Sequence, residues 1–377
     1  MKKILVLLLS AAMMTAALAG CGTTTPASST PVPDATEQTE QSTTTGSDSY
    51  ELALITDVGT IDDKSFNQGS WEGLKKYADE FGITHKYYKP AEKTDAAYLE
   101  SIDLAVKGGA KIIVTPGYLF EPSIYQAQDL YPDVKFILVD GVPNADGEQK
   151  INENVVPILY AEEQSGFLAG YAAVKDGYKK LGYMGGIAVP AVIKFGYGFV
   201  QGAEYAATEL GLKAGELEIK YTYVGNFEAT PENQTLASSW FQGGTELIFA
   251  CGGGVGNSVM SAAEQAGKKV IGVDVDQSGE SETVITSAMK MLGNSVYQTI
   301  EQSYANAFPG GKLAMLDAST DAVGLPMESS KFNTFTQADY DAIFAKVAAN
   351  EIKILDHEGI ADASKLPVKI AKVSVIA

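Results

Sequence analysis

Several residues whose side chains could contact a ligand follow short apolar runs of the sequence. Phe66 and Asn67 are adjacent in a polar segment that comes after the first such run, and Asp140 and Asp274 each end a later one. A phenyl ring can stack on a flat ligand, and an amide offers a donor and an acceptor to the edge of that ligand. An ionised carboxylate only accepts hydrogen bonds, so it suits hydroxyl groups. The two aspartates could instead cap helices that follow strands, which is a common use of aspartate.

The elements that would position these residues alternate between strand and helix along most of the chain. Strands are expected at residues 52–55, 85–88, 111–115, 136–140, 181–184, 218–223, 246–251, 269–274 and 313–316. Helices are expected at residues 70–81, 96–106, 123–130, 162–175, 198–210, 234–242, 257–266, 294–307 and 338–349. Strands that read as continuous apolar runs are buried on both faces, which indicates parallel sheets covered by helices.

This alternation predicts an α/β fold with two doubly wound lobes joined by a hinge, similar to a type I periplasmic binding protein. The lobes are expected to comprise residues 49–160 with about 288–316, and residues 161–287 with about 317–377. Doubly wound lobes bind ligands at the carboxyl ends of their strands. Two such lobes that face each other would enclose one cleft, which closes around a solute by hinge motion.

The N-terminal part of the chain predicts a targeting segment rather than part of the fold. Two lysines precede the apolar stretch 4–17, which is too short to span a bilayer. Residues 18–21, Leu-Ala-Gly-Cys, resemble a bacterial lipobox, which implies removal of the signal peptide 1–20 and a diacylglycerol on Cys21. The alternative is a plain secretory signal with an incidental cysteine. Residues 21–48 are rich in Thr, Ser and Pro, so we expect a disordered tether behind the lipid anchor.

The composition narrows the classes of ligand and chemistry. The chain has a net charge of -19, and its 28 basic residues are all lysines. An acidic surface without arginine argues against a nucleic-acid partner and against a phosphorylated ligand, because bidentate phosphate clamps favour arginine. The 2 histidines lie in unrelated contexts, and Cys251, the cysteine outside the lipobox, lies in an apolar run. We therefore expect no metal site, no cofactor and no nucleophilic relay.

A motif after the first apolar run, Asp63-Lys64-Ser65-Phe66-Asn67, resembles a signature of the basic membrane protein family. Its members are substrate-binding lipoproteins of ABC transporters, also called purine nucleoside receptors. The similarity continues in order through residues 136–141, 163–170, 194–199, 272–277 and 286–290. It implies an extracytoplasmic protein, lipid-anchored to the cell membrane, that is not an enzyme. Such a protein binds a purine nucleoside between its lobes as a monomer and passes it to an ABC transporter permease.

The resemblance also implies roles for individual residues of this sequence. Phe66 would stack on the purine base and Asn67 would hydrogen-bond to it, with Phe195 on the other side of the base. Asp140 and Asp274 would hold the ribose hydroxyls. The other implied contacts are Lys290 at the ribose, Asp57 at the base end, and Gly252 and Gly253 where backbone approaches the sugar. The segment before Phe195 departs from the family pattern, so the base preference is expected to differ.

Other functions fit some of the same features. A binding protein of this fold could take a sugar or another furanose in place of a nucleoside. A nucleoside-hydrolysing enzyme could hold Ca²⁺ with Asp57, Asp62 and Asp63, since carboxylates this close in sequence can bind a hard cation. No second catalytic constellation accompanies these aspartates, so solute binding is the predicted function. A role as an adhesin or surface receptor is compatible with the same sequence.

Overall fold

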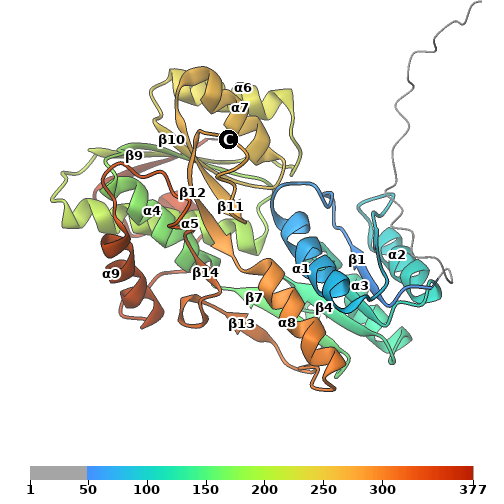
Figure 1. The fold of residues 1–377 in the computed structure, drawn as a ribbon. Helices are drawn as coiled ribbons and strands as arrows, with labels where there is room; N and C mark the ends of the chain where they lie inside the picture. The colour runs from blue at the N-terminus through green and yellow to red at the C-terminus, as the bar shows by residue number, and fades with distance from the viewer. Residues whose placement is uncertain (1–48, 377) are drawn as a thin grey trace, which may run out of the picture. The chain divides into compact units, whose positions relative to one another are not determined.

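The computed structural model describes residues 49–376, which build two sheets flanked by helices (Figure 1). We call each sheet with its helices a lobe. The predicted signal peptide, Cys21 and the predicted tether, all within residues 1–48, lie outside the described residues. Among the described residues, no helix combines the length and the apolar character needed to cross a membrane.

The first lobe contains a sheet in which all strands are parallel. In spatial order its strands are β13 (Ala314–Leu316), β7 (Val155–Tyr160), β4 (Lys135–Val139), β3 (Ile112–Pro116), β1 (Leu52–Ile55) and β2 (His85–Tyr88). Its helices are α1 (Phe66–Phe81), α2 (Asp95–Lys107), α3 (Glu121–Leu130) and α8 (Leu292–Tyr304). Alternate residues of β1 point to opposite faces, so Leu54 packs with Leu74 of α1 and Ile55 packs with Tyr98 of α2.

The second lobe contains a larger sheet, parallel except for one short antiparallel strand at an edge. In spatial order its strands are β14 (Val323–Gly324), β12 (Val284–Lys290), β11 (Lys269–Asp274), β10 (Leu247–Cys251), β8 (Lys180–Gly185), β9 (Leu217–Tyr223) and β15 (Ala371–Val375). Its helices are α4 (Glu162–Lys175), α5 (Pro190–Glu209), α6 (Pro231–Gln242), α7 (Val255–Ala266) and α9 (Gln337–Ala348). α4 and α5 share one core with Phe249 of β10, whereas α6 and α7 share another with Ile248.

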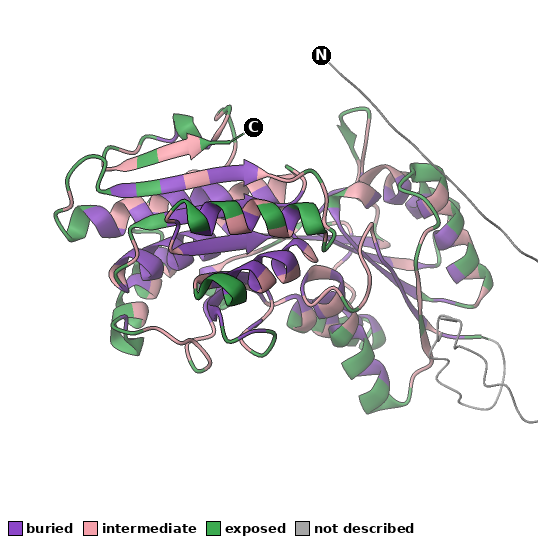
Figure 2. Cartoon of the chain, turned by 90° about the horizontal axis from the view of Figure 1, so that it is seen from above, coloured by how far each residue is buried: buried purple, intermediate pink, exposed green. Residues whose placement is uncertain are grey.

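Short elements complete the described chain. A small antiparallel hairpin pairs β5 (Asn144–Ala145) with β6 (Glu148–Gln149). Three single-turn 3₁₀ helices lie at Tyr118–Phe120, Ala318–Thr320 and Ala363–Lys365. The strands of both sheets are mostly buried and the helices expose their outer faces (Figure 2), as expected for sheets covered on both sides.

Glycines allow α4 and α5 to pack very closely. Gly166 and Gly170 lie one turn apart on α4, and Gly198 and Gly202 lie one turn apart on α5. A Cβ added to Gly202 would lie 1.9 Å from the backbone oxygen of Phe167, and one added to Gly170 would lie 2.0 Å from that of Phe199. Any larger side chain would therefore force the two helices apart.

The two lobes repeat one strand order, which confirms the predicted α/β fold. The order β2-β1-β3-β4-β7 in the first sheet corresponds to β9-β8-β10-β11-β12 in the second. The chain passes between lobes after β7, after β12 and again between β13 and β14. β12 therefore pairs in the second sheet as far as Lys290, while α8 and β13 belong to the first lobe.

Candidate functional site

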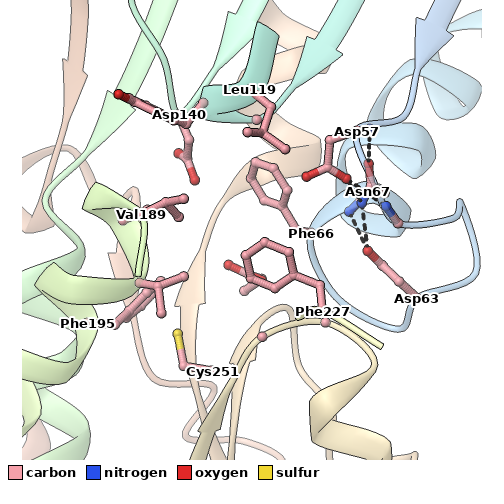
Figure 3. Close-up of a pocket in the computed structure, with 18 of the residues that line it drawn as sticks. Asp57, Asp63, Phe66, Asn67, Leu119, Asp140, Val189, Phe195, Phe227 and Cys251 are labelled. Atoms are coloured by element: carbon pink, nitrogen blue, oxygen red, sulfur yellow. Dashed lines mark hydrogen bonds between the residues drawn. The ribbon is translucent and has the colours of Figure 1, made fainter. Parts of the chain in front are cut away.

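A pocket lies between the lobes at the carboxyl ends of the strands, where doubly wound sheets bind their ligands (Figure 3). Both lobes contribute to its lining. All nine residues predicted from the sequence as ligand contacts line it: Asp57, Phe66, Asn67, Asp140, Phe195, Gly252, Gly253, Asp274 and Lys290. The lining also includes residues that were not predicted from the sequence as ligand contacts, among them Leu119, Val189, Phe227 and Cys251.

The aromatic residues of the pocket differ in how far they reach into it. Phe66 is the first residue of α1 and is partly buried, and Figure 3 shows its ring extending into the pocket. Phe195 lies on α5 with only 1% of its surface exposed, and its ring meets Phe249 edge-on at 6.0 Å. Phe227 follows β9 and is partly buried, and its ring also extends into the pocket. Phe66 and Phe227 therefore offer more open aromatic surface than Phe195.

Acidic and amide groups line the end of the pocket next to α1. The side-chain nitrogen of Asn67 donates to Asp57 Oδ1 and to Asp63 Oδ2, each at 3.0 Å. Both amide hydrogens of Asn67 are thus used within the protein. Asp57 Oδ1 also accepts from the backbone of Gly59, and its other oxygen is turned to the pocket (Figure 3). At this end the protein presents a carboxylate acceptor, whose pKa is raised by burial.

Asp63 serves mainly as a cap of α1. Its carboxylate accepts hydrogen bonds from the backbone N–H groups of Ser65, Asn67 and Gln68, which have no partner within the helix. Burial raises the pKa of Asp63 to about 6. This cap fixes the start of α1, and with it the positions of Phe66 and Asn67.

A cluster of buried charges forms another part of the pocket lining. Lys290 Nζ donates a short hydrogen bond to Asp140 and lies 3.3 Å from Asp274 Oδ1. It also lies 3.8 Å from Glu162 Oε1 at the start of α4, and Glu162 Oε2 lies 3.3 Å from Lys194 Nζ. Lys290 is 2% exposed and Glu162 is 2% exposed. Glu162 was not predicted as a site residue, because its role depends on the passage of the chain between the lobes.

The protonation states of this cluster follow from burial and mutual attraction. Burial alone would lower the pKa of Lys290, but Asp140, Asp274 and Glu162 outweigh it and raise the pKa well above its usual value. Burial raises the pKa of Asp140 to about 7, against the opposing effect of the Lys290 charge. Asp140 Oδ1 is buried without a hydrogen-bond partner. A ligand hydroxyl could satisfy this oxygen.

Lys290 also contacts aromatic rings. Its Nζ lies 4.6 Å from the centre of the Phe66 ring, 5.4 Å from that of Phe195 and 5.6 Å from that of Tyr160. These distances are within the range of cation–π attraction. The ammonium therefore lies next to both the carboxylates and the aromatic rings of the pocket.

Some lining residues of the pocket need particular backbone conformations. Asp140 and Asp274 both have left-handed backbones, with φ of 58° and 68°. Gly253 has a φ of 53°, and a Cβ on its neighbour Gly252 would lie 2.8 Å from the backbone nitrogen of Gly186. The structure thus gives Gly252 a packing reason for lacking a side chain.

The structure offers little support for hydrolytic chemistry. Asp62 is exposed, whereas Asp57 and Asp63 are occupied by Asn67 and by backbone donors. In residues 49–376, no group of three or more His, Cys, Asp or Glu side chains is arranged to hold a metal ion. Burial raises the pKa of the Cys251 thiol, so it is a poor nucleophile.

The chain resembles known proteins over most of its length. Residues 50–362 match the sequence model of a family described as "ABC transporter substrate-binding protein PnrA-like". The "ABC transporter nucleoside-binding protein BmpA" of Lactococcus lactis is 26% identical over 303 residues, 74% of this chain and 82% of that protein. "Basic membrane protein A" of Borreliella burgdorferi is 30% identical over 312 residues, 81% of this chain and 88% of that protein.

Solved structures show the same fold. A solute-binding protein of an ABC transporter system from Aeropyrum pernix K1 superposes with a TM-score of 0.73 at 21% identity. The match covers 82% of this chain and 94% of that one. At this identity the likeness shows the two-lobed fold alone.

Proposed function

Because the chain belongs to the family of PnrA-like ABC transporter substrate-binding proteins, we propose that it binds a purine nucleoside between its lobes and passes it to the permease of an ABC transporter. One observation supports this proposal above the others. The pocket combines open aromatic surface at Phe66 and Phe227 with the buried acceptors of Asp140 and Asp274. A nucleoside has a flat apolar base and hydroxyl donors in one molecule, and a bare pentose lacks the base.

The proposed pose follows from the positions of these groups. The base lies against Phe66 with Phe227 as its second aromatic contact, because Phe195 is almost fully buried. The ribose hydroxyls donate to Asp140 and Asp274, and charged hydrogen bonds of this kind contribute about 1.5–3 kcal/mol each. Lys290 neutralises part of this charge and faces the sugar.

Asp57 would make the main hydrogen bond to the base. Both N–H groups of Asn67 are used by carboxylates, so we assign Asn67 the role of holding Asp57 rather than of donating to the base. Asp57 offers an acceptor, which matches the N1–H of hypoxanthine or guanine and does not match the unprotonated N1 of adenine. Inosine and guanosine are therefore the expected ligands.

The proposal can be tested with purified protein and a panel of solutes. Calorimetry with inosine, guanosine, adenosine, uridine, ribose and inosine monophosphate should show binding of inosine and guanosine and weak or no binding of ribose. The monophosphate should be rejected, because the pocket is lined by carboxylates and holds a single lysine among its lining residues. Mass spectrometry of the solute that copurifies with the protein is an independent check. Binding of ribose with no gain from a base would contradict the proposal.

We also propose that Cys21 carries a lipid that holds the binding lobes on the extracytoplasmic face of the cell membrane. This part of the proposal rests on the lipobox-like residues 18–21 and on the family. Metabolic labelling with an alkyne fatty acid should mark the parent protein and leave a Cys21→Ala variant unmarked. Equal labelling of both would contradict lipidation at Cys21. The folded part is proposed to act as a monomer, which light scattering would test.

A further inference from the structure

A direct hydrogen bond joins the two lobes at Asp274. Ser65 lies in the first lobe, directly before α1, and its side chain is fully buried. Its hydroxyl donates to Asp274 Oδ2 in the second lobe at 2.5 Å. The other carboxylate oxygen of Asp274 faces Lys290 within the second lobe. The orientation of Asp274 is therefore set by one partner from each lobe.

Gln277 makes a second connection beside the first. Its Oε1 accepts from the backbone of Val273 at 2.9 Å, and its Nε2 donates to the backbone oxygen of Lys64 in the other lobe at 2.7 Å. A Cβ added to Gly272 would lie 2.4 Å from Gln277 Oε1, so this glycine leaves the space that the amide fills. The amide is thus fixed by the end of β11 and directed at the opposite lobe.

The backbones joined by these bonds are themselves unusual. Lys64 and Asp274 both have positive φ, 61° and 68°. A residue other than glycine keeps this conformation only where its surroundings hold it. The ion pair between Lys64 Nζ and Glu280 Oε1, at 3.7 Å, adds a further contact between the lobes at the same place. Several independent contacts therefore meet at the segment that leads into Phe66.

We infer that Ser65 and Gln277 are positioning residues, which latch the lobes together and thereby orient Asp274 for the solute. The latch consists of the side chains of Ser65 and Gln277 with their partners Asp274 and Lys64. Ser65 occupies Oδ2 of Asp274 and turns Oδ1 toward Lys290 and the pocket. The latch exists only when the lobes meet, so a solute bound to Asp274 and the latch stabilise the same closed state. The identity of the solute rests on the proposed function, whereas closure by the latch does not.

The test compares latch variants with matched controls. Ser65→Ala and Gln277→Leu remove the two donors. Ser123→Ala and Gln128→Leu are the controls, because both residues are buried and their hydrogen bonds stay within the first lobe. Small-angle scattering of the solute-free proteins reports lobe closure, and stopped-flow measurements with inosine report association and dissociation separately. Thermal unfolding shows that each variant is folded.

Loss of the latch is expected to change the dissociation rate of the solute much more than its association rate. Each latch variant should release inosine about tenfold faster or more, as expected for loss of a hydrogen bond to a charged group or across a buried interface. The association rate should change less than about twofold. Solute-free latch variants should also scatter as more extended particles than the parent and the controls. Parental scattering together with parental release rates would overturn the inference. If the parent does not bind inosine, the proposed function has failed, and scattering alone then decides the latch.

Discussion

Asp140 and Asp274 occupy equivalent positions in the two lobes and converge on the same ammonium group. Asp140 directly follows β4 and Asp274 ends β11, and these are the fourth strands in the strand order that the two lobes share. Each aspartate also has a left-handed backbone. Both carboxylates contact Lys290 Nζ, one from each lobe. The internal repeat of the fold thus supplies a symmetric pair of acceptors, and Lys290 breaks the symmetry because only the second lobe provides it.

Removal of Lys290 should therefore be more harmful to the fold than the loss of most single side chains. Lys290→Met leaves Asp140, Asp274 and Glu162 close together without their shared cation. We expect a loss of about 3–5 kcal/mol in the free energy of unfolding, as for other broken buried ion pairs. Urea denaturation measures this value. If repulsion among the three carboxylates causes this loss, the double variant Lys290→Met with Asp140→Asn should recover part of it. No recovery would contradict repulsion as the cause.

Nucleoside affinity should depend on pH through Asp140. The raised pKa of about 7 means that solute-free protein below that pH carries a proton on Asp140. Ribose hydroxyls donate best to the ionised form, so binding must release this proton. Affinity for inosine should therefore fall as pH decreases below about 7, by up to about tenfold per pH unit. Calorimetry from pH 5.5 to pH 8 checks the slope.

Other buried carboxyl groups also have raised pKa values, and one variant separates their effects from that of Asp140. Asp63 has a pKa of about 6 and Glu121 a pKa of about 7, both raised by burial. The Asp140→Asn variant should bind more weakly at pH 8 but lose most of the pH dependence. If its slope equals that of the parent, Asp140 is not the group responsible.

The raised pKa of Glu121 predicts a pH dependence of stability with a definite sign. The folded protein binds the proton more tightly than the unfolded chain, so this contribution is complete below pH about 4.5 and is lost as pH rises through about 7. Glu121→Gln keeps the acceptor for the backbone N–H of Val142 and removes the charge. The variant should show a smaller decrease of melting temperature between pH 5.5 and pH 8 than the parent. An identical decrease would exclude Glu121 as its source.

The two open aromatic rings should contribute to affinity more than to stability. Phe66→Ala and Phe227→Ala are each expected to weaken inosine binding by about 1–3 kcal/mol, the range for stacking of a base on an aromatic side chain. Phe308→Ala is a control, because Phe308 is partly buried but does not line the pocket. Phe195→Ala should instead reduce stability by about 3–5 kcal/mol, as for other buried phenylalanines. A stable Phe195→Ala variant with the affinity loss of Phe66→Ala would restore Phe195 as the second stacking residue.

Base selectivity should follow the hydrogen bond proposed for Asp57. Methylation of N1 removes the donor, so 1-methylinosine should bind at least about tenfold more weakly than inosine. Asp57→Asn should reduce the preference for inosine over adenosine, since an amide offers both a donor and an acceptor. Competition calorimetry measures both ratios. Equal affinity for inosine and 1-methylinosine would show that Asp57 does not accept a hydrogen bond from N1–H.

Most of the regular elements could be predicted from the sequence, because their strands are continuous apolar runs. In residues 49–376, six strands were not predicted, and three of them, β5, β6 and β14, have only two residues each. The other three are longer. β7 contains Pro157 within its apolar run, and β15 is a short edge strand with alternating character. β12 contains Thr286 and Ser287, which are buried because Ser330 and the backbone of Gln277 provide their hydrogen-bond partners. Such distant partners cannot be read from local patterns.

The pocket lining was easier to predict than the direction of its side chains. The family resemblance led to nine residues that all line one pocket. One of them, Phe195, is almost fully buried and packs edge-on against Phe249 in the core of the second lobe. The simpler rule that aromatic residues after strands contact ligands would have found Phe227, four residues after β9. Asn67 lies at the predicted place, yet its hydrogen bonds to Asp57 and Asp63 depend on a loop conformation that the sequence does not reveal.

Because the chain passes repeatedly between the lobes, neither lobe is encoded by one continuous segment of the gene. The first lobe combines residues 52–160 with α8 and β13, which come more than a hundred residues later, and the second is interrupted by that same return. A gene fragment cut at any single site would therefore leave one sheet without a strand or a covering helix. Swapping lobes between related receptors would require several simultaneous crossover points, so new solute preferences in this architecture are more readily acquired by substitutions at the pocket than by exchange of whole lobes.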